Sequence, residues 1–103
     1  AASKAALANI TKNSANALRS QRIRVNGINV GWMDTPGEDT IQREFHGAPA
    51  DWLEQAEAKQ PFGMLVKPGH VAGLASYMLS DASGVMTGAM VDFDQNVTGA
   101  YGE

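Results

Sequence analysis

The 103-residue sequence contains no cysteine, and it has no apolar run long enough to span a membrane. Without cysteine there is no disulfide and no thiolate metal site, which suits a reducing, cytoplasmic setting. The sequence also lacks the charged and then apolar leader that is typical of a signal peptide. We therefore expect a soluble, cytoplasmic chain with no membrane partner.

An excess of basic residues is missing too, since 8 Lys+Arg stand against 11 Asp+Glu for a formal net charge of −3. A nucleic-acid-binding domain needs a basic surface, so we expect no nucleic-acid partner. The only two histidines, His46 and His70, are too far apart and too poorly partnered to form a metal pair, so we expect no metal site. The length allows one small domain at most.

Residues 1–21 predict one long helix, because alanine is frequent and apolar residues recur every three or four positions. The expected apolar stripe is Leu7, Ile10, Ser14, Ala17 and Leu18. A second line is made of small residues, which allow another helix to approach closely: Ala2, Ala6, Asn9, Asn13 and Ala17. No residue before Ala1 caps this helix, so either its beginning is missing or an initiator methionine was removed and the helix starts frayed.

Residues 23–30 predict a short strand, because Ile and Val recur there with few charges. We expect this strand to be buried on both faces and to end at Gly31. Residues 32–37 then form a loop.

Two short helical pieces are expected after that loop. Asp39 with Gln42, and Asp51 with Glu54, have the spacing of capping boxes and predict where each piece begins. We expect Pro61 to close the second piece.

A longer helix is expected to open at Pro68, a residue suited to the first helical position. Its expected apolar face is Val71, Leu74, Ala75, Met78 and Leu79. Gly84 is the expected stop signal, and residues 89–93 predict a second strand.

The predicted order is helix, strand, helical excursion, helix, strand, which indicates an α/β fold with a parallel sheet. Two parallel strands leave two open edges and cannot bury both of their faces. The pattern therefore predicts that residues 1–103 form one part of a larger domain.

Three residues are candidates for chemistry, each with a structural alternative. Lys4 lies in the first turn of the first helix, where the helix dipole disfavours a cation. It is either a solvated lysine or one that lowers the pKa of a neighbouring phenol. Gly31, at the carboxyl end of a strand, lies where open α/β sheets bind ligands, and Thr35 offers a hydroxyl; together they also fit an ordinary turn.

The sequence resembles the C-terminal part of short-chain dehydrogenases/reductases over nearly its whole length. Each matching piece is weak, but their joint order is specific. The pieces are AASKAAL at 1–7, IRVNGI at 23–28, GWMDT at 31–35, KPGHVA at 67–72, SDAS at 80–83 and TG at 87–88. The resemblance implies the C-terminal portion of a Rossmann-like, doubly wound parallel sheet, with the N-terminal nucleotide-binding half outside residues 1–103.

The resemblance also implies roles for single residues. Lys4 corresponds to the catalytic lysine that bonds the nicotinamide ribose and lowers the pKa of a tyrosine, which would stand directly before Ala1. The backbone amide of Met33 would face the nicotinamide carboxamide, beside Gly31 and Trp32. Thr35 would contact the cofactor near the same end.

Residues 38–65 correspond to the variable excursion that covers the substrate, and Trp32, Trp52 and Met64 are the expected pocket residues. Two departures from the family pattern stand out. Val30 replaces the usual proline before the loop glycine, which loosens the turn. Residues 92–94 read Asp-Phe-Asp in place of Asp-Gly-Gly, which puts the usual packing of the tail in doubt.

The resemblance implies an oxidoreductase that uses NAD or NADP and acts on a small-molecule carbonyl or secondary alcohol. The 103 residues alone are expected to be inactive, because the tyrosine and the pyrophosphate-binding turn are not among them. A homo-oligomer is expected through the first helix. The alternative is a non-catalytic interaction module that pairs through the small-residue line of that helix.

Overall fold

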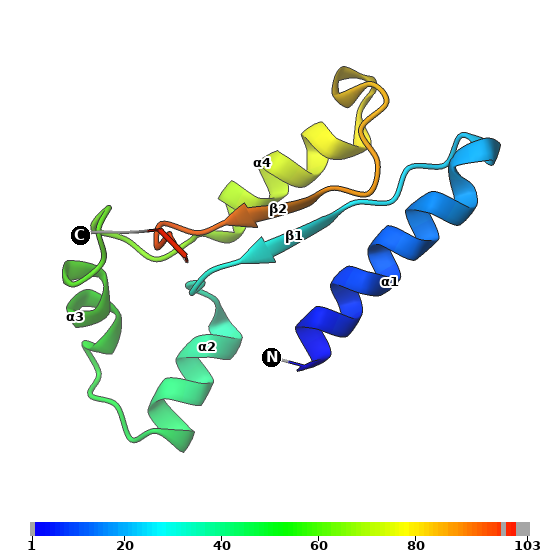
Figure 1. The fold of residues 1–103 in the computed structure, drawn as a ribbon. Coiled ribbons are helices and arrows are strands. Elements are labelled where there is room, and N and C mark those ends of the chain that lie inside the picture. The colour runs from blue at the N-terminus through cyan, green and yellow to red at the C-terminus, as the bar shows by residue number, and fades with distance from the viewer. Residues whose placement is uncertain (1, 98, 101–103) are drawn as a thin grey trace. The chain divides into compact units, whose positions relative to one another are not determined.

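A computed structural model describes residues 2–97 and 99–100 (Figure 1). The helices and strands are, in chain order, α1 (Ala2–Leu18), β1 (Gly27–Val30), α2 (Pro36–Thr40), α3 (Trp52–Ala58), α4 (Pro68–Leu79) and β2 (Met90–Phe93). Two 3-10 turns, Arg19–Gln21 and Asp81–Ser83, follow α1 and α4, and a π-helical turn, Ile41–Phe45, continues α2. The chain divides into two compact units, which we call the first unit (residues 1–29 and 73–92) and the second unit (residues 30–72 and 93–103).

The predicted order of elements and the parallel sheet are confirmed. β1 and β2 are neighbours in a two-stranded sheet. The N–H of Gly27 donates to the carbonyl of Ala89 (2.8 Å), and the N–H of Gly31 donates to that of Phe93 (2.9 Å). Both bonds join residues at the same offset, as parallel strands do.

The strand predicted over residues 23–30 is shorter, and it is not buried on both faces. Only Gly27–Val30 is extended in the sheet, and Ile23 is 45% exposed. The residues of β1 are half-buried or exposed. The physical reason is that only β2 pairs with β1 among the described residues, so the apolar faces lack a full covering layer.

Helix α1 forms as predicted over Ala2–Leu18, but a different face is buried. Leu7 and Ile10 of the expected apolar stripe are each 60% exposed, whereas Thr11 and Ala15 are buried. A Cβ on Gly88 would lie only 3.6 Å from the Cβ of Ala15, so α1 approaches the backbone before β2 closely. A close approach requires small residues, and this requirement decides which face packs. The predicted small-residue line is also exposed.

Helix α4 starts at Pro68 as predicted, but its predicted face is only half-buried over Val71, Leu74 and Ala75. Met78 is buried, but Leu79 is 85% exposed. The expected stop residue, Gly84, closes the following 3-10 turn instead of the helix, with φ at +62°. The guanidinium of Arg24 reaches this turn and donates to the hydroxyl of Ser83 (2.6 Å).

Helix α2 begins earlier than predicted. The N–H of Glu38 donates to the hydroxyl oxygen of Thr35 (3.0 Å), and Pro36 takes the first helical position. Thr35 and Glu38 therefore form the cap, and the predicted start at Asp39 is wrong. The competing signal was in the sequence, since Thr35 and Glu38 have capping-box spacing and enclose a proline.

Helix α3 begins at Trp52, directly after the predicted cap Asp51, and ends at Ala58, three residues before Pro61. The carboxylate of Asp51 makes no cap, however. It accepts a hydrogen bond from the side-chain amide of Gln55 (3.0 Å) instead. The position of this start was predicted correctly and its cause was not.

Candidate functional site

Gly31 directly follows β1, as predicted, and the carboxylate of Asp94 lies against it. A Cβ built on Gly31 would come within 2.5 Å of both Cγ and Oδ1 of Asp94. No real side chain tolerates that separation, so this contact requires glycine at position 31 in the observed arrangement. The departure from the family pattern at position 94 thus bears directly on the candidate loop.

Met33 forms an isolated parallel bridge with Val66. The N–H of Val66 donates to the carbonyl of Trp32 (2.9 Å), and the N–H of Asp34 donates to the carbonyl of Val66 (2.9 Å). Val66 thus bonds the two neighbours of Met33. In a parallel bridge of this kind, the residue between those two neighbours directs its own N–H and C=O away from the partner strand. The amide donor and the carbonyl acceptor of Met33 are therefore turned to the opposite side of the segment. A carboxamide, with one acceptor and one donor group, suits such a pair.

Three charged side chains fasten this segment to the start of α4. The ammonium of Lys67 lies 2.9 Å from Oδ2 of Asp34 and 2.5 Å from Oε2 of Glu57. The same oxygen of Glu57 accepts the N–H of Leu65 (2.9 Å). The hydrogen bond from Lys67, and then that from the Leu65 backbone, lower the pKa of Glu57, while Glu57 and Asp34 raise the pKa of Lys67. We call Asp34, Glu57 and Lys67 the ion triad.

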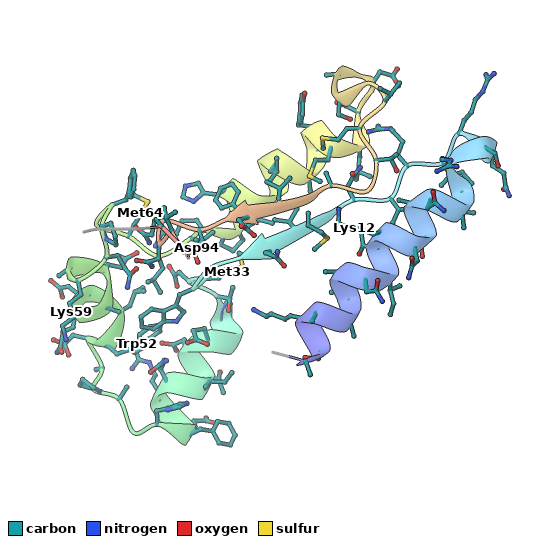
Figure 2. The ribbon with its side chains drawn as sticks, in the orientation of Figure 1. Lys12, Met33, Trp52, Lys59, Met64 and Asp94 are labelled. Carbon is teal, nitrogen blue, oxygen red and sulfur yellow. The ribbon has the colours of Figure 1, made fainter. Side chains whose placement is uncertain are left out.

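The two tryptophans named as pocket residues, Trp32 and Trp52, stack on each other with ring centroids 6.2 Å apart. Figure 2 labels Trp52, which belongs to α3. The indole N–H of Trp32 donates to Oε2 of Glu38 (2.7 Å), and that of Trp52 donates to Oδ1 of Asp39 (2.7 Å). Trp52 is buried, whereas Trp32 is 40% exposed. An exposed aromatic face with a fixed orientation is therefore available beside the Met33 segment.

Hydrogen bonds lower the pKa of both carboxyl groups that hold these indoles. For Glu38 the side-chain amide of Gln42 contributes most and Trp32 next; for Asp39 it is Arg43 and then Trp52. Both groups are therefore carboxylates at neutral pH, and each accepts an indole N–H as a charge-assisted hydrogen bond.

The structure brings four of the five predicted site residues into one continuous segment of the second unit: Gly31, Trp32, Met33 and Thr35. The hydroxyl oxygen of Thr35 accepts a hydrogen bond from the N–H of Glu38. The hydroxyl proton of Thr35 therefore remains as a donor to a ligand. Lys4 belongs to the first unit, where it lies exposed in the first turn of α1. Its proximity to the other four residues stays a prediction.

Sequence reasoning missed the residues that position this segment. Asp34, Glu57 and Lys67 contact one another across 33 and 10 positions, and no spacing rule links residues so far apart. No sequence pattern singles out Gln95, although its side-chain amide donates to the carbonyl of Met64. Among the described residues no group of three or more His, Asp or Glu side chains is placed to hold a metal ion, and no helix is both long and apolar enough to cross a membrane.

Comparison with known proteins adds an independent line of evidence. The family model described as enoyl-(acyl carrier protein) reductase matches residues 1–98. A cis-4-hydroxycyclohexanecarboxylate dehydrogenase from Sinomonas cyclohexanicum is 35% identical over 97 residues, which cover 94% of this chain and 36% of the relative. The chain therefore spans little more than a third of that relative's length.

Solved structures agree on the fold. A short chain dehydrogenase family protein from Francisella tularensis superposes with a TM-score of 0.76 at 33% identity, covering 90% of this chain and 40% of that one. A 4-hydroxyisoleucine dehydrogenase complexed with NADH superposes with a TM-score of 0.74 at 26% identity, covering 97% and 39%. Other matched structures contain NADPH. The predicted α/β, Rossmann-like architecture is thus confirmed, and so is a nicotinamide cofactor at the level of the family. This chain belongs to the short-chain dehydrogenase/reductase family.

Proposed function

We propose that this chain is the C-terminal part of an NAD(P)-dependent oxidoreductase that acts on a small-molecule carbonyl compound or secondary alcohol. The observation that carries the proposal is the bridge between Met33 and Val66, which turns the backbone amide and carbonyl of Met33 outward beside the end of β1. The carboxyl ends of parallel strands are where α/β sheets bind nucleotide ligands. The chain covers 36% to 40% of the relatives described above, and we propose that residues 1–103 complete a domain whose nucleotide-binding half lies outside them.

The residues of the second unit fit the nicotinamide end of such a cofactor. Met33 supplies a backbone donor and acceptor, and Thr35 supplies a hydroxyl proton. Gly31 brings no side chain into the space at the strand end. When bound, the cofactor supplies hydride transfer at C4 of its nicotinamide, and the protein holds and orients that ring.

We assign Lys4 the task of holding a ribose hydroxyl and stabilising the phenolate of an acid–base tyrosine. An ammonium near a phenol lowers the phenol's pKa, because it stabilises the charged form. The exposed ammonium of Lys4 is free to approach a cofactor, since the first turn of α1 is not covered in the described chain.

The test is a pair of lysine variants in the intact protein that carries this chain. Probe reactions are oxidation of cis-4-hydroxycyclohexanecarboxylate and reduction of an acetoacetyl thioester, each with NAD(H) and with NADP(H). Lys4→Met should lower kcat about 10²- to 10⁴-fold, the usual contribution of assisted proton transfer, and move the alkaline limb of the pH profile. Lys12→Met is the matched control on the same helix, because Lys12 only donates to the carbonyl of Gly88 (2.7 Å). Equal kcat values in the two variants would contradict the role assigned to Lys4.

The 103-residue chain alone should not turn over these probes, because it supplies neither the tyrosine before Lys4 nor a glycine-rich pyrophosphate turn. The absorbance of the reduced nicotinamide cofactor is the readout. Measurable turnover by the purified chain would contradict the assignment of the acid–base group to residues outside it.

We also propose that the protein associates with itself through α1. The small-residue line of α1 is exposed, and Leu7 and Ile10 lie exposed on the same helix. Apolar side chains left uncovered on a helix favour contact with another apolar surface. Light scattering of the intact protein tests this: Ile10→Glu should shift the mass toward the monomer, and an unchanged mass would overturn the proposed contact.

A further inference from the structure

Gln95 makes two hydrogen bonds to the backbone of the turn that precedes Leu65. Its Oε1 accepts the N–H of Phe62 (2.9 Å), and its Nε2 donates to the carbonyl of Met64 (2.6 Å). One side-chain amide thus satisfies a donor and an acceptor two residues apart, as the backbone of a neighbouring strand would do. We call this pair of bonds the Gln95 clamp.

The residues beside Gln95 tie the same stretch of tail to its surroundings. The carboxylate of Asp94 lies against Gly31, and its Oδ1 accepts the N–H of Asn96 (3.1 Å). Nδ2 of Asn96 lies 3.4 Å from the side-chain oxygen of Gln60. The tail after β2 therefore contacts both the start of the candidate cofactor loop and the end of the excursion that covers the substrate in the family pattern. Met33, Met64 and Asp94 are all labelled in Figure 2.

The turn over residues 60–64 is held mainly by hydrogen bonds. Phe62 is 77% exposed and Met64 is 42% exposed, so packing restrains Phe62 little and Met64 only in part. The turn itself is closed by the N–H of Gly63, which donates to the carbonyl of Gln60 (3.0 Å). Packing resumes only at Leu65 and Val66, which are 0% and 5% exposed. The Gln95 clamp therefore holds the backbone on both sides of Gly63, while the hydrogen bond from the Leu65 N–H to Glu57 holds the residue after Met64.

We propose that Gln95 is a positioning residue, which fixes the turn over residues 60–64 so that Met64 forms a wall of the substrate pocket. The inference rests on the proposed function for the existence of that pocket. It also gives a role to the tail, where this chain departs from the Asp-Gly-Gly pattern. The thioether side chain of methionine is flexible, so it can shape a pocket only if its backbone is held in place.

The experiment measures hydrogen exchange and steady-state kinetics on the intact protein, with the cis-4-hydroxycyclohexanecarboxylate and acetoacetyl thioester probes. Gln95→Met keeps the length of the side chain and removes both hydrogen bonds. Gln95→Glu keeps the acceptor for the Phe62 amide and removes the donor to Met64. Gln21→Met is the matched control, because Gln21 is exposed in the turn after α1, in the first unit.

Gln95→Met should accelerate exchange of the Phe62 amide about 3- to 10-fold, which corresponds to the usual net worth of one hydrogen bond. It should raise KM for the turned-over probe by a similar factor, with kcat and the KM for cofactor within about 2-fold of the unsubstituted protein. Gln95→Glu should leave the Phe62 amide closer to its original protection, and Gln21→Met should change neither readout.

Unchanged exchange at Phe62 in Gln95→Met would overturn the clamp. Faster exchange with an unchanged KM for the probe would overturn its positioning role, because a loosened turn would then have no effect on the pocket. A fall in kcat with both KM values unchanged would contradict it as well. Absence of any nicotinamide-dependent turnover in the unsubstituted protein would overturn the proposed function instead, and the exchange result would then decide the clamp alone.

Discussion

The two units of the chain use their side chains in different ways. The first unit contains the longest helix, α1, yet buries mainly small or polar side chains, among them Ala15, Thr11 and Ser83, and leaves Leu79 and Val85 85% and 94% exposed. The second unit has shorter helices but buries Trp52, Leu65 and Val66, and it contains the ion pairs found among the described residues. The ion pairs gather in the second unit, whereas the first unit relies on its long helix and on hydrogen bonds to backbone carbonyls, such as those that Arg24 and Asn26 donate to Met86.

This difference indicates where the precise geometry of the site comes from. A cofactor-binding loop must keep one backbone conformation although it belongs to no helix or strand. The second unit supplies that by a bridge at Val66, the ion triad and the Thr35 cap. The first unit offers exposed apolar surface, which fits the proposal that it packs against further protein. Three pairs of matched substitutions compare the two units, and a fourth compares two lysines of the second unit, in order of decreasing expected effect.

The largest expected effect comes from truncating leucine in each unit. Leu65 is fully buried and Leu79 is 85% exposed. Leu65→Ala should lower the free energy of unfolding by about 2–5 kcal/mol, because it removes buried methyl groups and leaves a cavity. Leu79→Ala should change it by no more than about 0.5 kcal/mol. Denaturant unfolding of the intact protein that carries this chain measures both, and similar losses in the two variants would contradict the contrast between the units.

The second pair compares the glycines at the two ends of β1. Gly31→Ala drives a Cβ into the carboxylate of Asp94, and displacing that carboxylate also breaks its hydrogen bond to Asn96. We expect a loss of about 1–3 kcal/mol in the free energy of unfolding. Gly27→Ala meets only the flexible end of Met90, with Sδ at 2.5 Å, and should cost less than about 1 kcal/mol because the thioether rotates away.

A double substitution identifies the cause of the Gly31 effect. In the Asp94→Ala background the obstructing carboxylate is gone, so Gly31→Ala should cost less than in the original sequence. Additive losses in the double variant would show that backbone conformation, rather than Asp94, makes glycine necessary at position 31.

The third pair removes a threonine hydroxyl from each unit. Thr35→Val deletes the N-cap of α2 and should cost about 1 kcal/mol, because the N–H of Glu38 loses its acceptor. Thr11 only donates to the carbonyl of Leu7 in its own helix (2.9 Å), so Thr11→Val should stay within about 0.5 kcal/mol. Thermal unfolding compares them, and an equal or larger loss for Thr11→Val would contradict the expected difference between the two units.

The regular elements were the predictable part of this fold. Local signals set the extent of α1, the start of α4 at Pro68 and the end of β1 before Gly31, because alanine content, proline position and strand composition act within a few residues. The buried face of α1 was not predictable from its apolar stripe. Which face packs depends on the glycine backbone that it meets near Gly88, and that partner lies more than 70 positions away.

The candidate site divides in the same way. The continuous segment from Gly31 to Thr35 could be recognised because its members are adjacent in sequence and follow a strand. The ion triad and the Gln95 clamp could not, since they join residues between 10 and 33 positions apart through tertiary contacts. Thr35 and Glu38 are the exception, because their capping-box spacing is visible in the sequence, next to the pair Asp39 and Gln42 that predicts a later start.

The smallest expected effect concerns the pH dependence of the ion triad. The pKa of Glu57 is lowered, so its contribution to stability is present above its ordinary value of 4.5 and is lost as pH falls through the lower folded value. The pKa of Lys67 is raised, so its contribution is present below 10.5 and is lost as pH rises through the higher folded value. Between these limits Lys67→Met should cost about 1 kcal/mol, because the side chains of the triad remain partly exposed and solvent screens them.

Free energies of unfolding at about pH 7 and about pH 3 test this sign. The deficit of Lys67→Met should shrink as the pH falls through the lowered pKa of Glu57, because protonation removes the charge that Lys67 pairs with, and it should shrink in high salt as well. Lys59→Met is the control from the same unit and should show no such trend, since Lys59 is exposed at the end of α3. A deficit that stays constant from neutral to acidic pH would mean that packing of the Lys67 stem, and not its charge, holds the Met33 segment to the start of α4.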